Sequence, residues 1–134
     1  MPIQRMSVDT YSAQYQHSHL DIQNPPWPKI EAVLRSMDRF AKPNLWLFED
    51  RDMPDGNCLA VCGGNGVYHV QVADADGNWT EAFDPHGSNE IVEVWESDQG
   101  FDTQAKKTWS LETTEKLVRW YFENGTRHPG YSWG

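Results

Sequence analysis

The side chain best suited to covalent chemistry is Cys62, which could act as a nucleophile with His69 or His86 as its base. A catalytic cysteine works as the thiolate, which a helix N-terminus or neighbouring cations stabilise. No helix is expected directly after Cys62, and the surrounding sequence is acidic. Cys58 and Cys62 also fall on one side of an alternating, strand-like pattern. The sequence therefore favours two buried core thiols and predicts no catalytic residue.

A second candidate is the run Gly63-Gly64-Asn65-Gly66, which could hold a phosphate if a helix followed it. Residues 67–72 (VYHVQV) alternate like a strand instead, and no Lys-Ser or Lys-Thr pair follows. Glycine and asparagine adopt positive φ at low cost, which a tight hairpin turn requires. We therefore interpret the run as a hairpin turn.

Two patterns resemble metal sites only in part. The segment Asp74-Ala-Asp-Gly-Asn78 begins like a calcium loop, but its sixth position is Trp79 and its twelfth is Pro85. His17 and His19 have no cysteine or carboxylate cluster at ligand spacing. We expect a hairpin turn, incidental histidines, and neither a metal nor another cofactor.

Two groups of acidic residues, one before the glycine run and one after it, are candidates for binding another protein. In such a surface, carboxylates meet basic residues of the partner and an aromatic side chain anchors the contact. Solubility is the commoner reason for surface carboxylates, and a hydrolase using paired carboxylates stays open. The candidate binding residues are Glu49, Asp50, Asp52, Asp55, Glu93, Trp95, Glu96, Asp98 and Trp133.

The whole chain is acidic, with 11 Lys and Arg against 20 Asp and Glu in 134 residues and a net charge of −9. Such a domain repels nucleic acids and anionic membranes and favours a basic partner. No signal peptide or transmembrane stretch is evident. Cys58 and Cys62 would lie about 13 Å apart along one strand, beyond disulfide reach. We expect reduced thiols, a cytoplasmic protein, and no direct contact with nucleic acid or membrane.

The elements that must position these residues predict one α+β domain. Residues 1–24 lack sustained periodicity and predict an irregular N-terminal arm, with a short strand near Met6–Tyr11. Residues 25–134 then form the domain. Its first element is an amphipathic helix that begins after Pro25-Pro26-Trp27-Pro28 and ends before Pro43.

Short strands separated by turn signals follow this helix. A second helix is capped by Ser110, extends to about Glu123 and stops at Gly125. We expect a single antiparallel meander of four to six strands, with two main helices and the aromatic tail packed on it. The expected strands include residues 45–49, both sides of the glycine run, 79–83 and 91–96.

Several of these features occur together, in the same order, in a known family. They are the opening helix, the strand–turn–strand from Leu59 to Val70, a strand after Asp76-Gly77, and a late helix with Trp120 and Phe122. From about Trp27 to Trp133 the chain resembles the Imm1 family of bacterial immunity proteins. The arm before Pro25 lies outside this resemblance.

The resemblance implies a non-enzymatic protein of a polymorphic toxin system that neutralises a cognate toxin. Family members are often encoded beside toxins of the deaminase superfamily, which act on nucleic acids or nucleotides. Such a toxin usually has a basic substrate groove, which an acidic inhibitor could occlude. The alternatives are a small cytoplasmic hydrolase or transferase that uses Cys62 or carboxylates, and an acidic interaction module outside any toxin system. No oligomeric state is predicted.

Overall fold

The computed structural model describes residues 3–11, 17–38, 43–49, 57–96 and 99–134. The strands are β1 (Arg5–Tyr11), β2 (His17–Gln23), β3 (Asn44–Phe48), β4 (Cys58–Gly64), β5 (Val67–Ala73), β6 (Trp79–Phe83), β7 (Ile91–Glu96), β8 (Gln99–Gln104) and β9 (Ser132–Trp133). The helices are α1 (Trp27–Ser36), the 3-10 helix η1 (Ala105–Lys107) and α2 (Leu111–Asn124).

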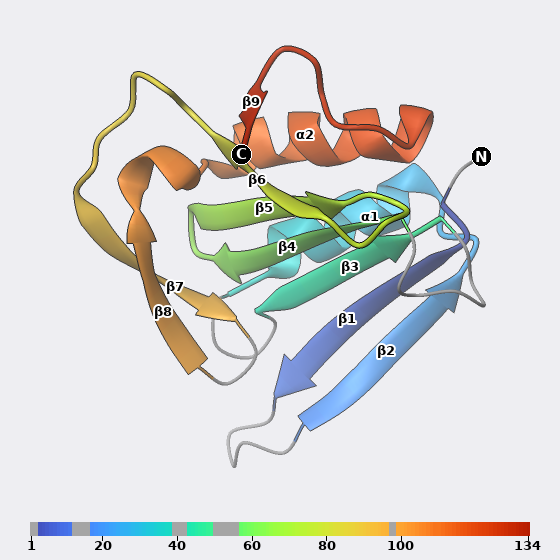
Figure 1. The fold of residues 1–134 in the computed structure, drawn as a ribbon. Coiled ribbons are helices and arrows are strands. Elements are labelled where there is room, and N and C mark those ends of the chain that lie inside the picture. The colour runs from blue at the N-terminus through green and yellow to red at the C-terminus, as the bar shows by residue number, and fades with distance from the viewer. Residues whose placement is uncertain (1–2, 12–16, 39–42, 50–56, 97–98) are drawn as a thin grey trace.

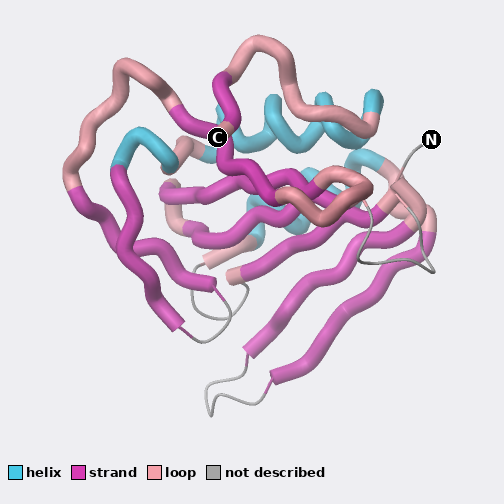
Figure 2. Tube along the Cα trace, viewed as in Figure 1, coloured by secondary structure: helices cyan, strands magenta, loops and turns pink. Residues whose placement is uncertain are grey.

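Seven of the strands form one antiparallel sheet in the order β2-β1-β3-β4-β5-β6-β9. Strands β7 and β8 form a separate two-stranded hairpin beside it (Figure 1). Helices α1 and α2 pack against each other and lie on one face of the large sheet (Figure 2). The α+β prediction is confirmed, but the predicted single meander of four to six strands is wrong, because the large sheet has seven strands and β7 and β8 form a second sheet.

Local signals in the sequence explain both helices. A proline stands in the first turn of α1, where its missing N–H costs no hydrogen bond. In α2 the hydroxyl of Ser110 accepts the N–H of Thr113 at 3.3 Å, and Gly125 ends the helix at φ 70°. These cap predictions are confirmed.

The core lies between the helices and one face of the sheet. Because successive side chains of a strand point to opposite faces, alternate residues of β4 and β5 enter the core. Leu59, Val61, Val70 and Val72 are buried there against Leu117 and its neighbours on α2. The intervening residues, Cys58, Cys62, His69 and Gln71, therefore belong to the opposite face of the sheet.

The N-terminal segment corrects a prediction. The predicted irregular arm, residues 1–24, contains two strands in its described part, because β1 pairs with both β2 and β3 inside the large sheet. The expected strand near Met6–Tyr11 is confirmed as β1, whose Met6 and Val8 are buried in the common core. The proposed boundary between residues 24 and 25 is therefore no boundary between structural units.

The other strands that were not predicted lie after β7 and at the end of the chain. Strand β8 was not predicted, because its sequence QGFDTQ is mostly polar. Strand β9 pairs Trp133 with Ala82 of β6, and Tyr131 packs against the core. The prediction that the aromatic tail packs on the domain is confirmed.

Candidate functional site

The glycine run forms the turn between β4 and β5, as predicted. Gly63, Gly64, Asn65 and Gly66 all have positive φ, and Gly64 pairs with Val67. A Cβ on Gly63 would stand 2.2 Å from the carbonyl oxygen of Val67, so only glycine fits this position. The turn leads into a strand and presents no helix N-terminus to a phosphate.

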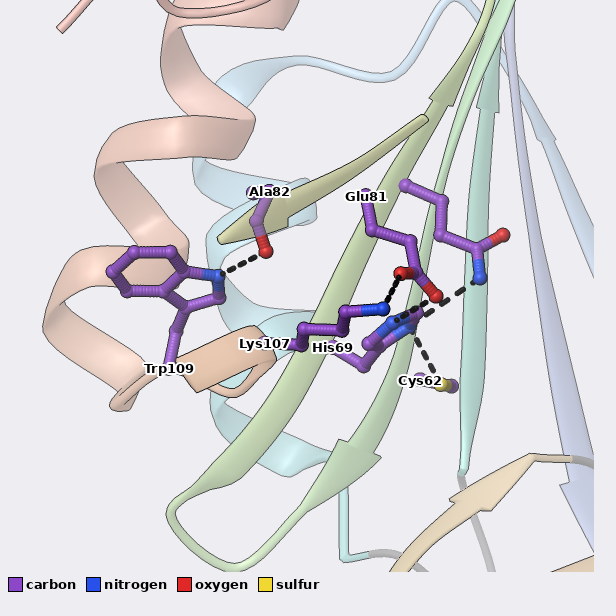
Figure 3. Close-up of polar contacts among 7 residues, drawn as sticks. Cys62, His69, Glu81, Ala82, Lys107 and Trp109 are labelled. Atoms are coloured by element: carbon purple, nitrogen blue, oxygen red, sulfur yellow. Dashed lines mark hydrogen bonds and ion pairs between the residues drawn. The ribbon is translucent and has the colours of Figure 1, made fainter. Parts of the chain in front are cut away.

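A polar cluster lies on the sheet face opposite the helices, centred on His69 of β5 (Figure 3). The Nε2 atom of His69 is 3.1 Å from Oε1 of Glu81 on β6. The Nζ atom of Lys107, on η1, is 2.9 Å from the other oxygen of Glu81. On its other side, Nδ1 of His69 is 3.9 Å from Sγ of Cys62 and 3.4 Å from the side-chain amide of Gln71.

Burial determines the charge states in this His69 cluster. His69 is 1% exposed, and this burial lowers its pKa despite the opposing effect of Glu81. Partial burial alone would raise the pKa of Glu81, but Lys107 and His69 together hold it below its ordinary value. The cluster is therefore a neutral imidazole beside a carboxylate–ammonium pair. With Nε2–H donated to Glu81, Nδ1 is the acceptor that faces Cys62.

A short aromatic anchor fixes the segment that carries Lys107. Trp109 exchanges backbone hydrogen bonds with Tyr68, at 2.8 and 3.0 Å. The indole N–H of Trp109 also donates to the carbonyl of Ala82 at 3.2 Å. Since Ala82 follows Glu81 directly, these bonds hold η1 at the strand that bears the carboxylate (Figure 3).

The chemical order of the His69 cluster is thiol, imidazole, carboxylate. This order occurs in enzymes that use an activated cysteine nucleophile. Here Cys62 is only 6% exposed, and the ring of Phe101 from β8 meets His69 edge-on with the ring centroids 5.5 Å apart. Neither cysteine is in a disulfide and both are buried, as the sequence predicted.

Strands β7 and β8 carry a second group of functional candidates, in which Glu93 is exposed and Trp95 half-buried. Val94 pairs with Phe101, and these residues face the large sheet. The neighbouring pair, Glu93 and Asp102, is exposed on the outer side. The indole N–H of Trp95 donates to Oε1 of Glu93 at 3.1 Å.

The remaining predicted binding residues do not join this group. Glu49 directly follows β3, and its N–H donates to the carbonyl of Asn57. Trp133 lies in β9 with its indole N–H donated to the carbonyl of His128 at 3.0 Å, so it contributes to the tail. Glu96 belongs to β7, but its side chain is not described. Asp50, Asp52, Asp55 and Asp98 lie outside the described residues.

Sequence reasoning considered His69 only as the base for Cys62 and missed Glu81 and Lys107. The signal available was the polar His69 between two apolar residues of a strand. Its partners lie on β6 and η1, and only the register of the sheet brings them together.

The sequence contains only partial metal-site patterns, at His17 and His19 and at Asp74–Asn78. In the described part of the chain no group of three or more histidines, cysteines and carboxylates could hold a metal ion. His19 instead contacts Asp9, with Nδ1 and Oδ1 2.8 Å apart. The Asp74 carboxylate accepts the N–H groups of Asp76 and Asn78, so this segment is a turn, as predicted.

Comparisons with known proteins find a similar fold but give no information on function. No family model matches the chain, and no curated protein matches it significantly. The chain is similar in structure to a hypothetical protein from Neisseria gonorrhoeae, with a TM-score of 0.62 and 11% identity. The similarity covers 94% of this chain and 91% of the other. No helix of the described residues has the length and apolarity needed to cross a membrane.

Proposed function

We propose that this protein is an immunity protein that binds a basic bacterial toxin and occludes its active site. The outer face of the β7–β8 hairpin is the proposed contact surface. The observation that carries this assignment is the cross-strand pair of Glu93 and Asp102, two like charges placed directly opposite each other. Such a pair weakens a hairpin, and a cation from a partner would relieve the repulsion.

Apolar groups beside this pair supply an anchor for the contact. Ile91, at the start of β7, is 61% exposed, the largest exposure among the large hydrophobic side chains that are described. Trp95, on the same side of the strand, is hydrogen-bonded to Glu93 and therefore held in place. An exposed apolar residue and a fixed indole between carboxylates match the composition of protein-binding hot spots.

The net charge of −9 supports the same type of partner. A toxin that acts on nucleic acid, such as a deaminase, carries a basic groove for its substrate. An acidic protein would approach this groove faster because opposite charges steer the encounter. We therefore propose a cytoplasmic inhibitor without catalysis of its own.

The experiment is to express this protein with the toxin encoded beside it and to measure both cell survival and binding by calorimetry. The informative variant is Glu93→Gln with Asp102→Asn, which removes two charges and little volume. We expect binding to weaken about tenfold or more. The matched control, Asp76→Asn with Glu112→Gln, makes the same charge change at two exposed positions elsewhere and should bind nearly as tightly. If the unaltered protein neither binds nor protects, the proposed function is wrong.

A thiol-dependent hydrolase or transferase is a second candidate, favoured by one specific observation. Cys62, His69 and Glu81 stand in the order of a catalytic triad, with contacts of 3.9 and 3.1 Å. This candidate predicts that Cys62→Ala abolishes the biological activity. The inhibitor candidate predicts that the same variant still protects cells, because the thiol is buried and takes no part in the hairpin surface. Cell survival with Cys62→Ala therefore separates the two.

A further inference from the structure

A cleft of about 350 Å³ lies where the end of β6, the start of α2 and the C-terminal tail meet. Three aromatic residues line it, Phe83, Trp109 and Tyr131. The acidic residue Asp84 also lines it. Its size is at the lower end of the range for small-ligand sites. None of these residues belongs to the acidic hairpin or to the His69 cluster.

The aromatic walls of this cleft are held in place. Trp109 is fixed by its indole hydrogen bond to the carbonyl of Ala82. Tyr131 meets Trp109 edge-on, with ring centroids 5.4 Å apart and planes at 89°. His128 also packs against Tyr131, with ring centroids 4.9 Å apart. A cleft whose walls are already ordered loses little conformational entropy when a ligand binds.

The carboxylate is also ordered, and within the described residues it has no cationic partner. Oδ1 of Asp84 accepts the N–H of His86 at 2.9 Å. Among the residues that the structure describes, none forms an ion pair with Asp84. Lys106 is adjacent and accepts the N–H of Asp84 with its carbonyl, but its ammonium group forms no such pair.

We propose that this aromatic cleft binds an arginine side chain of a basic partner protein. The electron-rich faces of aromatic rings attract cations, and a carboxylate adds direct charge pairing. Arginine fits better than lysine because its planar guanidinium stacks on rings and donates two parallel hydrogen bonds to a carboxylate. The identity of the partner rests on the proposed function, while the preference for arginine rests on the cleft alone.

The cleft is tested first without any partner, using N-acetyl-arginine-N-methylamide as the probe. Nuclear magnetic resonance follows the indole N–H signals of the seven tryptophans, and Trp109→Phe assigns the signal at the cleft. We expect the arginine probe to shift the Trp109 signal and the corresponding citrulline compound, which is neutral and nearly the same shape, to leave it unchanged. Equal shifts with both compounds, or none with either, would overturn the proposal.

The decisive variant is Asp84→Asn, which removes the charge but keeps the oxygen that accepts the N–H of His86. We expect it to weaken binding of the arginine probe about fivefold. Asp76→Asn removes a charge from the exposed β5–β6 turn and should change nothing. An equal affinity for Asp84→Asn and the unaltered protein would show that the carboxylate does not bind the cation.

The same pair of variants then tests whether the arginine comes from the toxin. We expect Asp84→Asn, but not Asp76→Asn, to weaken toxin binding. If the toxin binds both variants equally, the cleft is not part of the interface and this part of the proposal fails. If the unaltered protein binds no toxin, the proposed function fails, and the arginine probe still decides whether the cleft recognises arginine.

Discussion

The outer face of the β7–β8 hairpin and the His69 cluster are both rich in polar groups, yet they differ in the sign of the charges that face each other. In the His69 cluster, the imidazole, carboxylate and ammonium groups satisfy one another in a largely buried setting. On the hairpin, Glu93 and Asp102 repel each other in solvent. Internally paired groups stabilise a fold, whereas exposed like charges favour a partner of opposite sign.

The proposed function therefore rests on the residues of the hairpin surface and not on the residues typical of catalysis. Cys62 and His69 have suitable chemistry, but they lie beneath the hairpin, with Phe101 against the imidazole. Ile91, Glu93 and Trp95 have no reactive chemistry, but they lie on its outer face. Position, more than residue type, separates the two regions.

The largest expected effect is the loss of stability when the His69 cluster is broken. His69→Ala removes a fully buried ring, its contact with Phe101, and one of the two partners of Glu81. We expect the free energy of unfolding to fall by about 2–4 kcal/mol, measured by urea denaturation. His86→Ala makes the same substitution at an exposed position and should cost less than about 0.5 kcal/mol. Equal costs for the two variants would mean that the cluster has no structural role.

Neutralising charges on the hairpin should not lower the free energy of unfolding. Neutralising its like-charge pair with Glu93→Gln and Asp102→Asn should leave the free energy of unfolding unchanged or raise it by about 0.5 kcal/mol. The amide that Glu93→Gln introduces keeps an oxygen that can accept the indole N–H of Trp95. Urea denaturation of the double variant beside the unaltered protein measures the difference.

The control for the hairpin prediction is Glu115→Gln, which neutralises a carboxylate that faces an opposite charge. Glu115 pairs with Arg35 across the two helices at 3.0 Å. This substitution should lower stability, because it removes an attraction in place of a repulsion. If the hairpin variant loses stability as well, its carboxylates serve the fold and the contrast between the two regions disappears.

The parts of the fold that sequence predicted correctly depend on local signals. Ser110, Gly125 and the turn at Gly63 each follow from a short stretch of sequence and the φ or hydrogen bond that it needs. The pairing of β1 with β2 was not predicted. Met6 and Val8 of β1 point into the core, and the polar residues around them made the segment look like an irregular arm. The core contacts that make this segment a strand come from β3, which lies far along the chain.

The sequence predicted candidate residues on the β7–β8 hairpin but not the contacts of the His69 cluster. Glu93 and Trp95 were candidates because carboxylates cluster around a tryptophan within a short stretch of sequence. The contact of Glu81 with His69 and Lys107 depends on the register of β5 with β6 and on the path of η1. A pairing between two elements that are distant in sequence leaves no mark in either one, so the cluster became visible only in the folded chain.

A further expected effect is a dependence of stability on pH that comes from the buried imidazole. Burial holds the pKa of His69 below its ordinary value of 6.5 in the folded protein. In the unfolded chain the ring takes up a proton as the pH falls through 6.5, while in the folded protein burial shifts this protonation to lower pH. The unfolded state then binds more protons, so stability is complete above pH 6.5 and decreases below it. One pH unit below 6.5, the loss is at most about 1.4 kcal/mol.

This pH dependence is measured as the urea midpoint between about pH 7.5 and 5.5, a range in which Glu81 stays ionised because its pKa is held below 4.5. His69→Gln keeps an N–H donor for Glu81 but cannot titrate, so the decrease at low pH should become smaller. His86→Gln, at an exposed position, should keep the full decrease. If His69→Gln retains the same slope as the unaltered protein, His69 binds protons equally in the folded and unfolded states, and burial does not lower its pKa.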